Sequence, residues 1–228
     1  MTTLTNDQIR QLNNYSVYLE PTSVPIFHSK NVESSLPIIK LISGAPNDPI
    51  AASFFMRRVG MFISMQFYMM TMYDEIWDGP LEFLQFFAAT EYGNKTISTY
   101  VSGEYFREVK EHRAEDIQLI WEHQCFSIIQ QLRAQCSISP QTLWENVFGY
   151  LLWHYYVFLE NPVIAEQAKI DWDLLQDENI WKSFTSKSHL AKYLRGQQPS
   201  KLMNTTVRTT CCFSKDIPGL QKCGYCPN

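Results

Sequence analysis

The feature that most constrains this chain is the clustering of its cysteines near one end. Four of the six cysteines fall within the last eighteen residues, as Cys211, Cys212, Cys223 and Cys226. Thiolates are soft ligands that select zinc, copper(I) or iron–sulfur centres. So short a segment can surround one inorganic centre by itself, and we expect it to fold as an irregular loop around that centre.

The spacing of the cysteines bears on which centre they hold. Cys223 and Cys226 have the C-x2-C spacing that zinc and iron–sulfur sites share. In the adjacent pair Cys211 and Cys212, the α-carbons lie about 3.8 Å apart, and successive side chains of an extended segment point to opposite sides. One tetrahedral zinc would need a contorted backbone to receive both sulfurs, whereas a two-iron cluster offers ligand positions in different directions. The spacing favours iron–sulfur, with structural zinc and a pair of disulfides as the alternatives.

The residues between the two cysteine pairs are suited to a loop. Pro218-Gly219 is a strong turn signal that lets the chain fold back. Gly224 lets the backbone approach a sulfur closely, where amide groups can donate hydrogen bonds.

The same segment resembles a known family. Residues 208–212 (Arg-Thr-Thr-Cys-Cys), then ten residues, then 223–227 (Cys-Gly-Tyr-Cys-Pro) are similar to the C-terminal signature of the FhuF-type ferric-siderophore reductases. The resemblance implies that Cys211, Cys212, Cys223 and Cys226 hold a [2Fe–2S] cluster, with Arg208 as a companion. Residues 143–146 resemble a helix start of that family, which makes Trp144 and Asn146 candidates for the substrate pocket.

The resemblance implies one-electron reduction of ferric siderophores in the cytoplasm. Siderophores hold ferric iron through hard oxygen donors, which bind ferrous iron far more weakly, so one electron releases the metal. The chain shows no nucleotide-binding motif, so a separate electron donor is expected. Basic residues collect near the cysteines and either neutralise the centre or attract an anionic chelate; they are Lys201, Arg208, Lys215 and Lys222.

Two other functions remain open at this point. The first is a non-redox module that binds ferric chelates and uses the cysteines for structural zinc. The second is an iron–sulfur sensor or interaction protein whose cluster reports iron status.

Composition excludes some classes of function. The net charge of −4 argues against a general nucleic-acid binder. The first residues show no basic region followed by an apolar run, so no signal peptide is expected. The most apolar stretch, residues 59–73, is shorter than the roughly 20 residues of a membrane span and predicts a buried helix. A protein of the reducing cytoplasm follows, with peripheral membrane association left open.

Sequence patterns predict an α+β fold, mostly helical, with a small antiparallel sheet or hairpin in the N-terminal half and an irregular C-terminal tail. Asp48 and Pro49 predict the start of a long helix ending near Trp77. Two strands joined by a tight turn are expected between residues 81 and 101. Other expected elements are helices at 5–14, 115–137, 139–159, from 161, 180–184 and 189–194, and a short strand at 38–42.

We expect three regions along the chain. Residues 1–105 form an N-terminal α+β region, residues 106–200 a helical region, and residues 201–228 the segment that binds the iron–sulfur cluster. The three regions together are also the right size to form one domain with a single hydrophobic core.

Overall fold

The computed structural model describes residues 4–21, 23–109, 111–199 and 208–223. The α-helices of these ranges are α1 (Asn6–Asn14), α2 (Leu36–Ser43), α3 (Asp48–Tyr73), α4 (Arg113–Leu119), α5 (Ser127–Gln135), α6 (Pro140–Glu160), α7 (Ala165–Gln176), α8 (Glu178–Trp181) and α9 (His189–Leu194). The strands are β1 (Val17–Tyr18), β2 (Phe27–His28), β3 (Glu75–Trp77), β4 (Gln85–Glu91), β5 (Asn94–Tyr100) and β6 (Phe106–Glu108). Shorter helical turns are η1 (Ser29–Ser34), η2 (Leu81–Phe83), η3 (Gly103–Tyr105), the π-helical η4 (Ile120–Phe126) and η5 (Ser214–Asp216).

The expected α+β class, mostly helical with a small N-terminal sheet, is confirmed. The four-stranded sheet has the order β1-β5-β4-β2, and β1 pairs with β5 in parallel while the other pairs are antiparallel. Strands β3 and β6 form a separate antiparallel pair. The predicted tight turn is also confirmed, because Tyr92 and Gly93 join β4 to β5 with positive φ values of 50° and 78°, as a two-residue hairpin turn requires.

One predicted element is wrong, and one predicted helix ends earlier than expected. The strand expected at 38–42 is helix α2, which has a proline in its first turn and ends at Gly44 with φ 71°; a short apolar run does not distinguish strand from helix. The long helix α3 begins at Asp48 with Asn47 as its cap, and it ends at Tyr73, not near Trp77. Asp74 adopts a left-handed conformation, and the chain continues as β3.

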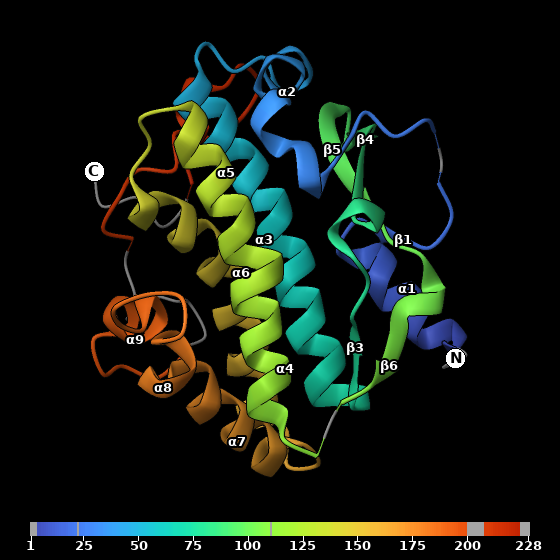
Figure 1. Ribbon diagram of the computed structural model, residues 1–228, viewed down its shortest axis with the longest axis vertical. Coiled ribbons are helices and arrows are strands. Elements are labelled where there is room, and N and C mark those ends of the chain that lie inside the picture. Colours follow the sequence, from blue (N-terminus) through green and yellow to red (C-terminus); the bar gives the residue numbers. More distant parts are fainter. Residues whose placement is uncertain (1–3, 22, 110, 200–207, 224–228) are drawn as a thin grey trace.

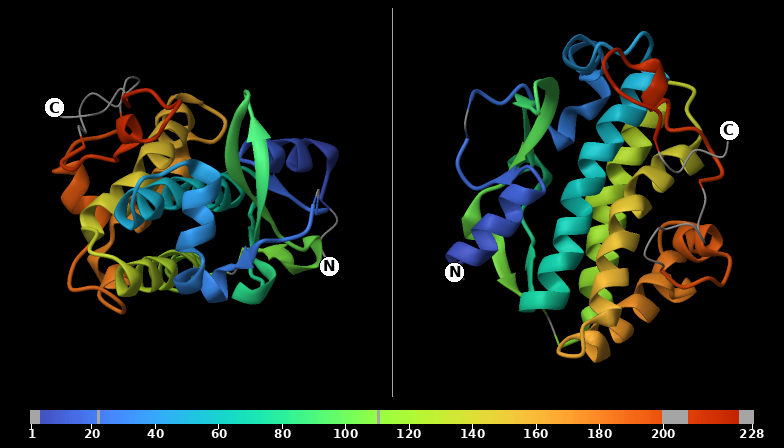
Figure 2. Two further views of the ribbon diagram at one scale, coloured as in Figure 1. Left: turned by 90° about the horizontal axis from the view of Figure 1, so that it is seen from above. Right: turned by 180° about the vertical axis from the view of Figure 1, so that it is seen from behind.

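Helices α3 and α6 form the centre of the molecule, with both sheets and α1 on one side and α7–α9 on the other (Figures 1 and 2). They run in the same direction, since Ser53 near the start of α3 contacts Asn146 and Thr71 near its end contacts Tyr155. One hydrophobic core spans the sheet, these two helices and the C-terminal helices. The apolar residues 59–73 lie largely within it, as expected. Within the described ranges, no helix combines the length and apolar character needed to cross a membrane.

Gly60 permits the close approach of α3 to α6. A Cβ atom added at Gly60 would lie 2.8 Å from the Asn146 carbonyl oxygen and 2.9 Å from the Val147 Cα. We expect Gly60→Ala to lower the free energy of unfolding by about 1–3 kcal/mol, because backbone atoms must move apart. The matched control is Gly149→Ala on α6, whose Cβ would meet no described atom within 4 Å. Urea unfolding of both variants tests this, and a Gly60→Ala protein as stable as the parent would contradict the close crossing.

Candidate functional site

The C-terminal segment, residues 208–223, lies against the N-terminal halves of α3 and α6 (Figure 2). Arg208 is buried and begins the contact. Its guanidinium donates to the carbonyl oxygens of Glu145 at 3.0 Å and Thr142 at 3.4 Å, and Nε donates to the Thr210 carbonyl at 3.2 Å. The side chain predicted to accompany the cysteines therefore attaches their segment to the first turns of α6.

Glu145 is the acceptor that holds the two threonines before the cysteines. Its side chain is fully buried. The backbone N–H of Thr209 donates to it at 3.0 Å and that of Thr210 at 3.1 Å, and both threonine hydroxyls donate as well. Arg208 Nε lies 3.8 Å from Glu145 Oε2, so the buried carboxylate also has a positive partner. This arrangement satisfies the polar groups of a buried segment that has no regular secondary structure.

A second chain of hydrogen bonds positions Cys212. The Ser53 hydroxyl of α3 donates to the Cys212 carbonyl at 2.8 Å. The Asn146 amide of α6 donates to the Ser53 carbonyl and hydroxyl, both at 3.0 Å. Side chains of both helices thereby fix the backbone of one cysteine.

The described cysteines of the segment face different surroundings. Cys212 is 3% exposed, whereas Cys211 and Cys223 are partly buried. The backbone N–H of Phe213 donates to Cys211 Sγ at 3.3 Å. Burial opposes ionisation of the Cys212 thiol, but hydrogen bonds from Ser214 and Cys223 and the charge of Arg208 together lower its pKa from the usual value.

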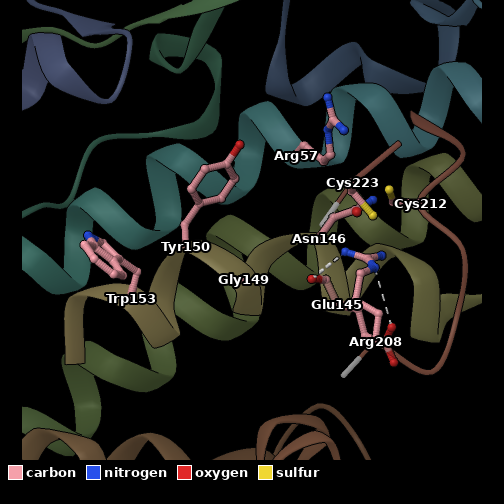
Figure 3. Close-up of a pocket in the computed structure, with 9 residues that line it drawn as sticks. All are labelled: Arg57, Glu145, Asn146, Gly149, Tyr150, Trp153, Arg208, Cys212 and Cys223. Atoms are coloured by element: carbon pink, nitrogen blue, oxygen red, sulfur yellow. Dashed lines mark hydrogen bonds and ion pairs between the residues drawn. The ribbon is translucent and has the colours of Figure 1, made fainter. Parts of the chain in front are cut away.

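Cys212 and Cys223 line one pocket, together with charged and aromatic side chains (Figure 3). The pocket has a volume of about 270 Å³, and its lining residues are Arg57, Glu145, Asn146, Gly149, Tyr150, Trp153, Arg208, Cys212 and Cys223. Arg57 donates to the Ser214 hydroxyl, which ties α3 to the turn that follows Cys212. Two arginines and one glutamate give this pocket a net positive charge.

The structure brings together part of the predicted cysteine set. Cys226 lies outside the described residues, as do Gly224 and Lys201. Cys211 is next to Cys212 in sequence but is not among the lining residues of the pocket. Over the described ranges, no three His, Cys, Asp or Glu side chains are grouped so as to hold a metal ion.

The predicted substrate residues have different outcomes. Arg208 and Asn146 line the pocket. Trp144 is fully buried, makes an edge-to-face contact with Trp181 at a ring-centroid distance of 5.1 Å and stacks with His189 at 5.2 Å. It is therefore a core residue and is not among the residues that line this pocket. Lys215 and Lys222 are exposed on the loop between the cysteine pairs and do not line the pocket.

Five pocket residues were missed by sequence reasoning: Arg57, Glu145, Gly149, Tyr150 and Trp153. A usable signal existed for the two aromatic residues. Tyr150 and Trp153 follow Asn146 by four and seven positions, which places all three on one face of a helix. No comparable signal exists for Arg57, because its contact with residues 208–223 depends on how α3 packs.

No protein-family model matches the chain, and no curated protein matches it.

Proposed function

We propose that this protein reduces ferric siderophore complexes by transferring one electron from a [2Fe–2S] cluster held by Cys211, Cys212, Cys223 and Cys226. The observation that supports this most is the position of Cys212 and Cys223 in the wall of a positively charged pocket. A substrate in that pocket lies directly against two of the proposed ligands. The proposed reaction takes place in the cytoplasm.

The described part of the site has the donor chemistry of such a cluster. The donor atoms are sulfurs, and thiolates are the usual ligands of iron–sulfur clusters. Hydrogen bonds already reach two of these sulfurs, from Phe213 to Cys211 and from Ser214 to Cys212. Such hydrogen bonds stabilise negative charge on sulfur and tune the reduction potential. The adjacent cysteines also face different surroundings, as ligands of two separate irons would.

The residues around the cysteines have distinct roles in this proposal. When bound, the cluster supplies electrons one at a time. Arg57 and Arg208 attract an anionic chelate and hold it beside Cys212 and Cys223. The Arg208–Glu145 pair keeps the cysteine segment seated, and burial of Cys212 keeps water from its sulfur. The chelated ferric ion gains one electron and becomes ferrous, its oxygen ligands weaken their hold, and a separate one-electron donor restores the protein.

We expect anaerobically purified protein to be coloured and to contain about two irons and two acid-labile sulfides per chain. After reduction with dithionite and removal of excess reductant, the addition of a ferric siderophore should reoxidise the cluster and yield one ferrous ion per reduced cluster. Reoxidation of the cluster is followed by visible absorbance, and release of ferrous ion is followed with a ferrous-specific chelator.

Two outcomes would contradict the proposed function. A colourless protein that contains zinc and still binds ferric siderophores would be a binding module with a structural metal. A cluster that is not reoxidised by any ferric chelate, while a protein partner binds only the cluster-loaded form, would indicate a sensor. Reduced protein without added chelate is the control for slow oxidation by residual oxygen.

A further inference from the structure

The pocket beside Cys212 and Cys223 has features that the attachment of the cysteine segment leaves unexplained. Gly149 lies inside α6, where glycine costs stability relative to alanine. In the described structure, apart from the neighbouring residues and backbone of its own helix, no heavy atom lies within 4 Å of where its Cβ would be. Helix packing therefore gives no reason for glycine here, whereas a flat molecule lying on this turn of α6 does.

Two polar atoms at the pocket also lack partners within the described ranges. Asn146 is 2% exposed, and although its amide N–H groups bind Ser53, its Oδ1 accepts no hydrogen bond. The Nε of Arg57 is buried and unpaired, while its Nη1 donates to the Ser214 hydroxyl. A buried acceptor or donor without a partner is unfavourable. Both atoms are shielded from solvent here, so a small movement of the two side chains toward the pocket would let a ligand bring a negative charge to Arg57 and an O–H or N–H to Asn146.

The remaining wall of the pocket is aromatic. Tyr150 and Trp153 are 37% and 47% exposed, and Figure 3 shows both rings on α6 beyond Gly149. Aromatic side chains favour stacked or edge-to-face contact with another ring. The volume of about 270 Å³ is below the range of roughly 300–1,000 Å³ that is typical of pockets for whole drug-sized ligands. The pocket thus suits one arm of a larger chelate.

We propose that this pocket binds one aromatic arm of a catecholate-type ferric chelate, with its ring over Gly149 and against Trp153. The assignment rests on the proposed function for its iron, but the binding chemistry is independent of electron transfer. A tris-catecholate complex of a trivalent metal is anionic and aromatic. A tris-hydroxamate complex is neutral and aliphatic, and a citrate complex is anionic and aliphatic. The arginines favour the two anionic complexes, the tris-catecholate and the citrate. The aromatic wall favours the tris-catecholate alone.

The test uses gallium(III) complexes, because gallium takes the place of ferric iron but is not reduced by the cluster. Titration calorimetry of the cluster-containing protein should show tighter binding of a gallium tris-catecholate than of gallium citrate or a gallium tris-hydroxamate, by about tenfold or more. Trp153→Ala should weaken the catecholate complex about tenfold, as loss of an aromatic contact predicts. Trp153→Phe should restore most of the affinity.

Gly149→Leu is the variant that tests most directly whether a ring lies over this turn of α6. Leucine is a good helix former and would occupy the space over this turn, so the protein should stay folded while catecholate binding falls more than tenfold. Phe83→Ala, which removes a partly exposed aromatic ring remote from the pocket residues, is the control and should leave affinity unchanged. Equal binding of the three gallium complexes, or full catecholate affinity in Gly149→Leu, would overturn the assignment.

Parallel assays with ferric chelates separate this assignment from the proposed function. If the three gallium complexes bind equally while ferric chelates are still reduced, the catecholate assignment is wrong and the reductase function stands. If gallium tris-catecholate binds over Gly149 but no ferric chelate is reduced, the assignment stands and the reductase function is wrong.

Discussion

Replacement of Cys212 by serine is expected to reduce cluster content and ferric-chelate reduction to background. Cys212 is 3% exposed, its carbonyl is held by Ser53, and it lines the pocket beside Cys223. A serine hydroxyl is a hard, neutral donor in place of a soft thiolate, so the proposed centre loses a ligand. Because the two side chains are similar in size, the fold should survive. Iron and sulfide analysis, visible absorbance and the ferrous-release assay measure the effect, and circular dichroism checks the fold.

Cys136→Ser is the matched control for that experiment. Cys136 is partly buried at the end of α5, and its thiol donates to the Leu132 carbonyl at 3.4 Å, which a hydroxyl can also do. We expect its cluster content and activity to equal those of the parent protein. A Cys212→Ser protein that keeps its colour and its full rate of chelate reduction would show that the C-terminal cysteines do not hold the redox centre.

Glu145→Gln should be the most destabilising of the polar substitutions at the site. The Glu145 carboxylate is fully buried and accepts hydrogen bonds from the backbone N–H and the hydroxyl of both Thr209 and Thr210. A glutamine amide would place its own N–H groups against some of these donors and remove the charge that faces Arg208. Breaking a buried charge pair costs about 3–5 kcal/mol. We expect the free energy of unfolding of the cluster-free protein to fall by about 3 kcal/mol in urea titration, and the cluster content to fall as well.

An exposed ion pair provides the control for this prediction. Lys169 and Asp173 form a contact of 2.6 Å on α7, with side chains that are 55% and 60% exposed. Asp173→Asn should change the free energy of unfolding by less than about 1 kcal/mol, because water screens such pairs. The double variant Glu145→Gln/Arg208→Gln should cost less than the sum of the two single variants, since the two charges act on each other. If Glu145→Gln costs no more than Asp173→Asn, residues 208–210 are not held as described.

Local signals predicted much of the fold and failed where an element depended on its surroundings. The hairpin at Tyr92-Gly93 and the start of α6 after Ser139 were predictable, because turn residues and caps act within a few positions. The end of α3 could not be predicted in this way. The helix stops at Asp74, which has a positive φ, because Glu75–Trp77 pair with β6, a strand some thirty residues later. Helix α2 was wrongly expected to contain a strand, because its apolar run is short.

The residues of the candidate site likewise include some that the sequence indicated and some that depend on packing. Trp144 and Asn146 were both taken as pocket candidates, but residues two positions apart on a helix point about 160° away from each other. One therefore enters the core and the other the pocket, and the pattern of residues near them does not say which does which. Arg57 is more than 150 residues from Cys212, and only the packing of α3 brings it there.

The sequence by itself determined which sulfur atoms are available to the proposed centre, because the four cysteines lie within sixteen residues of one another. The tertiary structure decided which side chains form the pocket beside these sulfur atoms. Arg57, Glu145 and Trp153 belong to two helices that are far apart in the chain and lie side by side only because Gly60 lets their backbones approach. Contacts of that kind arise from packing between distant segments, and no local spacing encodes them.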